Sequence, residues 1–161
     1  MIIRVHGHPA PQGSKKALGR SAAGKTIIVD SSPNTAPWRA DVKEAARATL
    51  EHLGWPAPFD GPLVMRVVFS FNRPATVKRS RRPFPSVYPD LSKLIRSTED
   101  ALKAAGVIKD DALICEYTRL AKVYVNEDEE ALDREGALII IGTLVDLVAV
   151  GGTPPQERKA A

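Results

Sequence analysis

The stretch PDLSKLIRSTEDALKAAGVIKDDALI, residues 89–114, combines a helix signal with carboxylates at both of its ends. Its apolar stripe recurs at helical spacing and comprises Leu91, Leu94, Ile95, Thr98, Ala101, Leu102 and Ala105. Gly106 follows the stripe, and glycine is the residue that most often ends a helix. The spacing therefore predicts a helix from about Leu91 to Ala105 that packs one face on a core.

One flank of this predicted helix is polar. At about 100° per residue, Ser92, Arg96, Glu99 and Lys103 lie near one another on the helical wheel. Asp90 precedes the helix, where a carboxylate can cap free backbone amides, and Asp110 and Asp111 suit an ordinary polar turn. The same carboxylates could also hold a metal ion. The residues alone leave both interpretations open.

The rest of the chain reads as strands and one further helix. Strands are expected at 2–7, 25–30, 62–72, 113–125 and 136–145, and a helix is expected from Pro37 to Gly54. The predicted class is α+β, a mixed β-sheet with two helices in the order ββαβαββ. The first two strands are expected to pair across the loop between them. Residues 1–145 are expected to form a single domain, and residues 146–161 a flexible tail.

Composition limits the classes of protein that this chain can represent. A single cysteine, Cys115, excludes an internal disulfide framework, and no cysteine and histidine spacing is typical of zinc. The apolar runs are too short to span a bilayer, and no signal peptide is recognisable at the N-terminus. His6 and His8 lack a third ligand nearby in sequence and are interpreted as edge-strand residues. We therefore expect a cytoplasmic protein without a membrane role.

Charge is segregated along the sequence. The net charge is +4, but residues 73–96 contain seven basic residues and one acid, residues 13–25 are basic without an acid, and residues 127–135 contain six acids. Such runs can be solvated loops, or they can contact nucleic-acid phosphates. In the second interpretation the acidic turn lies at a remote edge. The candidate DNA-binding residues are Lys15, Lys16, Lys78, Arg79, Arg81, Arg82 and Lys93.

The central stretch resembles the core motif of the RusA family of Holliday junction resolvases. That motif is approximately D-L-D-N/K-L-x-K/R-x-x-x-D-A-L, followed by a short turn and D-D-x-x-V/I. Upstream, GHPAPQGSKK and PWRADVKEAA resemble the first strand, basic loop and first helix of phage-borne members, so that the resemblance covers Ile2 to Val125.

The resemblance implies a dimeric α+β endodeoxyribonuclease that cuts four-way DNA junctions in recombination and repair. It implies Mg²⁺ as cofactor, with Mn²⁺ as a possible substitute, and Asp90, Arg96 and Asp111 as catalytic residues. Asp90 and Asp111 are the expected metal ligands. Asp110, Ser92 and Glu99 are further candidates for the metal site.

Ser92 departs from the family pattern, which has a carboxylate at this position. A serine hydroxyl is neutral and replaces a carboxylate poorly as a ligand of Mg²⁺. Glu99 or Asp110 could supply the missing charge. Alternatively, the chain binds junctions and cuts them weakly or not at all.

Overall fold

The computed structural model describes residues 1–13, 15–20, 24, 26–30, 32–56 and 58–143. The elements are β1 (Ile2–His6), β2 (Lys15–Arg20), β3 (Thr26–Asp30), α1 (Thr35–Leu53), β4 (Leu63–Phe71), α2 (Leu91–Ala105), a 3₁₀ turn (Asp111–Leu113), β5 (Ile114–Tyr124) and β6 (Gly136–Thr143). The predicted α+β class is confirmed, and the predicted order of elements matches closely, with β2 as an additional strand. The predicted tail lies outside the described residues.

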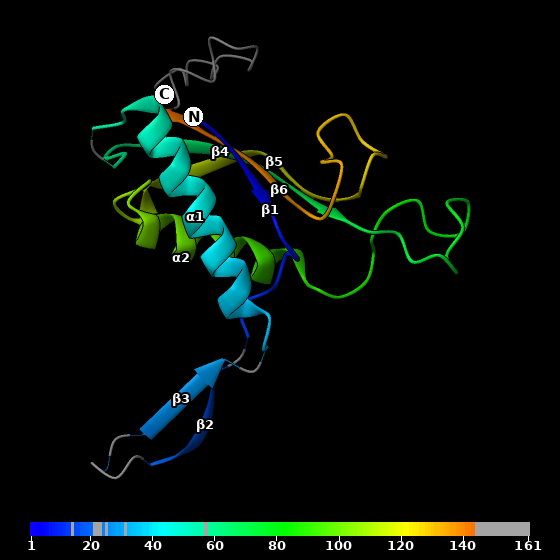
Figure 1. The fold of residues 1–161 in the computed structure, drawn as a ribbon, viewed down its shortest axis with the longest axis horizontal. Coiled ribbons are helices and arrows are strands. Elements are labelled where there is room, and N and C mark those ends of the chain that lie inside the picture. Colours follow the sequence, from blue (N-terminus) through cyan, green and yellow to red (C-terminus); the bar gives the residue numbers. More distant parts are fainter. Residues whose placement is uncertain (14, 21–23, 25, 31, 57, 144–161) are drawn as a thin grey trace, which may run out of the picture.

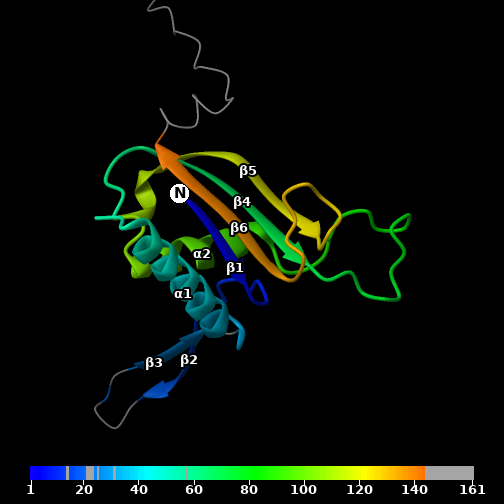
Figure 2. The ribbon, with the colours of Figure 1, turned by 45° about the horizontal axis from the view of Figure 1, so that its top comes forward.

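Four strands form a mixed sheet in the order β1-β6-β4-β5. The pair β4 and β5 is parallel, whereas β6 is antiparallel to both of its neighbours. Figures 1 and 2 show α1 and α2 together on one side of this sheet. Between them lies the core, whose largest fully buried side chains include Trp38, Phe69 and Ile139. β4 is central and is buried along almost its whole length, as its apolar sequence indicates.

The predicted pairing of the first two strands is wrong. β1 pairs with β6, near the other end of the described chain, while β3 pairs with β2 in a separate hairpin. Ile3 and Val5 of β1 join the same buried cluster as Ile139 and Ile141 of β6. The alternation within a strand tells which face is buried, but it does not specify the partner, which the shared core selects. Figure 1 shows the β2–β3 hairpin projecting from the body beyond one end of α1.

The two helices end and pack as the sequence predicts. Gly54 and Gly106 follow α1 and α2 in the left-handed conformation, at φ of 58° and 83°, and their amides bond to carbonyls of the last turns. The indole nitrogen of Trp38 in α1 donates to the Thr98 hydroxyl of α2 at 3.2 Å, inside the core. This buried bond, with the shared apolar core, holds the two helices against each other. It thereby fixes where both ends of α2 emerge.

The acidic segment 127–135 does not lie at a remote edge, contrary to the expectation from charge. The Arg73 guanidinium donates to both carboxylate oxygens of Glu127 at 2.7 Å and to the carbonyl oxygen of Arg82 at 2.6 Å. It also lies 3.7 Å above the Tyr124 ring. Arg73 is partly buried, and a guanidinium pairs well with a carboxylate through two parallel hydrogen bonds. The acidic turn therefore anchors the base of the basic loop 72–90 instead of opposing it from a distance.

Candidate active site and nucleic-acid interface

Asp90 occupies the N-cap position of α2, but its side chain forms no capping hydrogen bond. Its carboxylate is 56% exposed and lies 3.2 Å from the ammonium of Lys93 in the first turn. Ser92 and Arg96 are also exposed and extend the polar flank from this end of the helix. The capping interpretation of Asp90 is therefore not supported, and its carboxylate remains open to a ligand.

Lys122, which sequence reasoning did not identify, holds the chain just before Asp90. Its ammonium donates to the carbonyl oxygens of Val87 at 2.6 Å and Pro89 at 2.8 Å. Burial lowers the pKa of Lys122, and the nearby Asp90 carboxylate opposes that shift. The signal in the sequence was a lysine within the apolar end of β5, between Ala121 and Val123. Lys122 is thus a positioning residue for the segment that leads into α2.

Asp110 and Asp111 lie near the other end of α2. The Lys103 ammonium is 2.5 Å from Asp110 Oδ2 and 3.5 Å from Asp111 Oδ1. Asp110 also accepts the Ala112 amide at 3.0 Å, as the cap of the 3₁₀ turn. The Lys103 hydrogen bond, with the Ala112 amide, lowers the pKa of Asp110 to about 2. The turn interpretation is therefore correct for Asp110, while Asp111 is exposed and has the Lys103 ammonium nearby.

Glu99 belongs with this second group of carboxylates. The Tyr117 hydroxyl of β5 donates to Glu99 Oε1. Burial raises the pKa of Glu99, the Tyr117 bond lowers it, and the charge of Asp111 raises it again. Arg96 is close enough to oppose the increase. The charge of Asp111 therefore affects the pKa of Glu99. Tyr117 is a second positioning residue, which the sequence analysis did not identify.

One chain does not bring Asp90 and Asp111 together. They flank opposite ends of α2, which has 15 residues and is therefore about 22 Å long. Among the described residues, no group of three or more His, Cys, Asp or Glu side chains is placed to hold a metal ion. Mg²⁺ often takes only one or two protein carboxylates and keeps its waters, and Asp110 and Asp111 already share the charge of an ammonium. Each chain therefore has carboxylates at both ends of α2, and neither end reaches a group of three potential ligands among the described residues.

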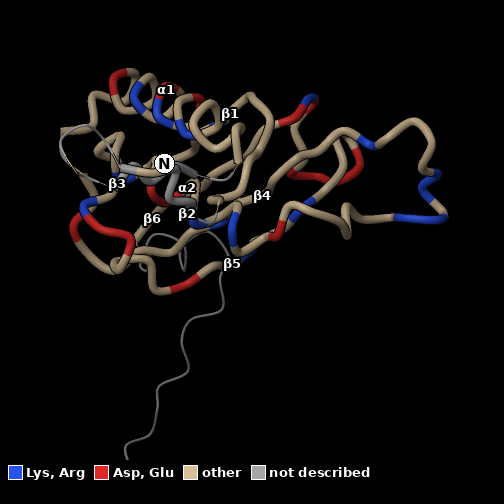
Figure 3. Tube along the Cα trace, turned by 90° about the horizontal axis from the view of Figure 1, so that it is seen from below, with Lys and Arg blue, Asp and Glu red and all other residues tan. Residues whose placement is uncertain are grey.

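The basic loop 72–90 projects from the sheet, and Figure 3 shows lysine and arginine at its far end. Lys78, Arg79 and Arg81 are exposed, and Arg82 is half-buried. Arg79 lies 3.5 Å from Glu127, whereas the other three have no ion pair within the described part of the chain. Lys15 and Lys16 begin β2 of the projecting hairpin, but their side chains lie outside what the structure describes. The loop thus presents positive charge far from the core.

The family model of endodeoxyribonuclease RusA matches residues 7–130, which include both helices and every candidate residue placed above. The chain belongs to the RusA family of endodeoxyribonucleases. These are DNA-cleaving hydrolases, generally dependent on a divalent metal ion, that resolve Holliday junctions. No curated protein matches the sequence closely enough to add a relative to this comparison. No helix in the described part is long and apolar enough to cross a membrane.

Proposed function

We propose that this chain is a Mg²⁺-dependent endonuclease that resolves four-way DNA junctions by paired nicks, as a homodimer. The observation that carries the proposal is the pair of carboxylate groups at the two ends of α2, in a chain of a junction-resolving family. Asp90 is exposed without a capping role, and Asp111 is exposed beside a cation. Neither carboxylate group forms a complete metal site by itself among the residues that the structure describes. Asp90 and Asp111 could contribute to the same site only if they come from two different chains.

Two copies related by a two-fold axis resolve this difficulty. If Asp90 of one copy meets Asp111 of its partner, a dimer contains two equivalent sites, as paired nicks on two strands require. Asp90 and Asp111 would hold the ion, with Glu99 and Asp110 next to Asp111. A bound Mg²⁺ would acidify a water and stabilise charge on the leaving oxygen. Arg96, exposed on the flank that joins the two ends, would stabilise charge developing on the phosphate.

DNA binding is assigned to separate residues. Lys78, Arg79, Arg81 and Arg82 would contact backbone phosphates from the projecting loop, Lys15 and Lys16 from the hairpin, and Lys93 beside Asp90. Phosphate contacts position DNA without reading its sequence. Loss of a carboxylate should consequently stop cleavage and leave junction binding nearly intact.

A second candidate function is junction binding with weak or no cleavage. Ser92 favours it, because this exposed residue lies in the first turn of α2 where the family motif has a carboxylate. Glu99 does not replace that carboxylate locally, since it bonds to Tyr117 and is two turns further along. The charge missing beside Asp90 would then have to come from the partner's Asp111 group.

Mixed dimers test the proposal directly. Asp90→Asn and Asp111→Asn proteins should each bind a four-way junction without cutting it. After subunit exchange, a mixed dimer would contain one site with both aspartates and one with neither, so nicking of a single strand should return with Mg²⁺. Recovery would not occur if each site took both residues from one chain. Wild-type protein that binds junctions but never nicks them would favour the second candidate function.

A further inference from the structure

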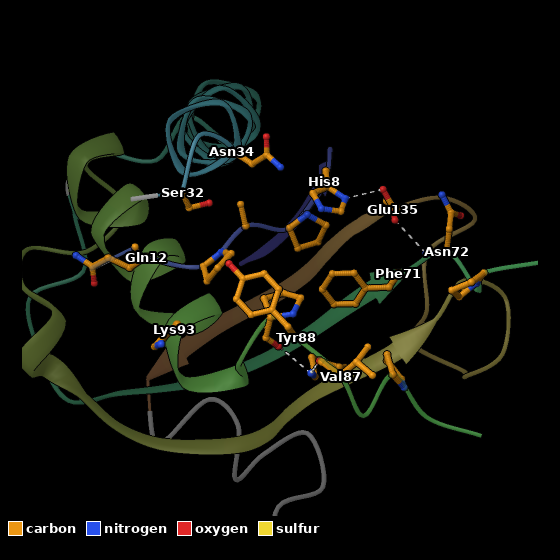
Figure 4. A pocket seen from close by; sticks show the side chains of 18 of the residues that line it. His8, Gln12, Ser32, Asn34, Phe71, Asn72, Val87, Tyr88, Lys93 and Glu135 are labelled. Atoms are coloured by element: carbon orange, nitrogen blue, oxygen red, sulfur yellow. Dashed lines mark hydrogen bonds and ion pairs between the residues drawn. The ribbon is translucent and has the colours of Figure 1, made fainter. Parts of the chain in front are cut away.

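A cavity of about 530 Å³ lies where the N-terminal ends of α1 and α2 meet the base of the basic loop. It is formed by segments far apart in sequence, including 8–13, 32–34, 71–72 and 87–89 (Figure 4). The proposed reaction uses none of these segments. Among the residues assigned above, Arg82, Lys93 and Lys122 line the cavity.

Aromatic and apolar groups form much of the cavity wall. Figure 4 shows the rings of Phe71, from the end of β4, and Tyr88, from the loop, both reaching into it. Phe71 is 8% exposed, whereas Tyr88 is 68% exposed. Pro9 and Pro11 add further apolar surface. An exposed ring at the mouth of such a cavity is a platform on which a flat group can stack.

The Tyr88 platform is held in place from both sides. Lys122 donates to the carbonyl oxygens of Val87 and Pro89, the residues directly before and after Tyr88. The half-buried Lys122 ammonium therefore fixes the backbone on both sides of Tyr88. Because Pro89 precedes Asp90, the platform is also fixed relative to the candidate catalytic end of α2.

Polar groups surround these apolar walls. The Asn34 side chain makes no capping bond at the start of α1 and is exposed, and His8 Nδ1 is 2.9 Å from Glu135 Oε2. Tyr124, 3% exposed, lines the cavity, and its hydroxyl has no hydrogen-bond partner among the described residues. Lys93 brings a positive charge to the same cavity. The cavity therefore offers flat apolar walls, donors and acceptors, and a cation.

We propose that this cavity binds one nucleobase that leaves the stack at the branch point of the junction, with Tyr88 stacking on it and Lys93 beside its phosphate. The inference rests on the proposed function, since it needs branched DNA to be bound. The volume lies within the range of about 300–1,000 Å³ usual for small-ligand sites. A base at an open branch is extruded at lower cost than one within a continuous duplex. The cavity would consequently help the protein to distinguish junctions from duplex DNA.

The test is a thermodynamic cycle between Tyr88 and the DNA. Binding of the full-length protein to a four-way junction is measured without divalent metal, with an abasic site placed in turn at each nucleotide next to the branch. Tyr88→Ala should weaken binding of the intact junction about tenfold. When the abasic site replaces the nucleotide whose base occupies the cavity, Tyr88 has no base to stack on. Tyr88→Ala and the parent should then bind that junction with equal affinity. Tyr88→Phe, which keeps the ring, should bind like the parent.

Phe84→Ala is the matched control, because Phe84 is an aromatic residue of the same loop, is 65% exposed and does not line the cavity. Its effect should not depend on any abasic position. The inference is overturned if Tyr88→Ala weakens every junction by the same factor, or if Phe84→Ala reproduces its pattern. A parent protein that binds no junction at all would instead overturn the proposed function, and the base site with it.

Discussion

The charges at the tip of the basic loop give the most direct quantitative prediction. Lys78, Arg81 and Arg82 have no acidic partner within the described part of the chain, whereas Arg79 is 3.5 Å from Glu127. The perturbation is therefore the triple replacement of Lys78, Arg81 and Arg82 by Ala. Arg79 stays, since its charge is already partly offset.

The magnitude follows from counterion release. Each phosphate neutralised by a cation contributes about −0.9 to the slope of log affinity against log salt concentration. Three phosphate contacts thus contribute about −2.7 to the slope. When salt rises from 50 to 200 mM, the affinity of the parent should therefore fall by a factor about 40 times larger than that of the triple variant. Arg79→Ala alone should change the slope by less than any one of the three.

The assay is equilibrium binding of a labelled junction over this salt range, without divalent metal to prevent cleavage. A matched control removes three charges elsewhere that have no ion pair within the described part of the chain, Arg4, Lys43 and Arg47. The control should keep the parent slope, as should the parent bound to a junction of different sequence. An unchanged slope in the loop variant would mean that its charges only solvate the loop. An equal decrease in the control would mean that net charge, and not this loop, governs binding.

Three further outcomes are expected. Ser92→Asp should raise Mg²⁺ affinity and junction cleavage in a Mg²⁺ titration, and no change would mean that the site already has its full charge. Lys103→Met removes the ammonium from Asp111 and should tighten Mn²⁺ binding, measured from the paramagnetic resonance of free Mn²⁺; weaker binding would contradict this. The Arg119 hydrogen bond lowers the pKa of Asp128 in the folded protein. The pair therefore stabilises the fold at pH values above the unfolded pKa of Asp128, and this stabilisation is lost as the pH falls through the folded pKa. The free energy of unfolding, taken from denaturation curves between about pH 5 and pH 3, should therefore fall less steeply with pH for Asp128→Asn than for the parent.

Local sequence determined the elements around the motif. The spacing from Leu91 to Ala105 and the glycine after it were sufficient to place α2, because helix periodicity and a left-handed C-cap are properties of neighbouring residues. The same holds for β4, β5 and β6, and for the α+β class. The family could also be recognised, since its motif lies on these local elements.

Contacts between distant segments could not be read in this way. The pairing of β1 with β6 depends on which surfaces share a core, and the approach of Glu127 to Arg73 depends on how the loops after β4 and β5 meet in space. The Tyr117 and Lys122 contacts depend on β5 running back along α2 beside β4. The sequence identified the carboxylates Asp90 and Asp111. Only the tertiary structure decided that a rigid helix, whose length grows by about 1.5 Å per residue, keeps them apart within one chain.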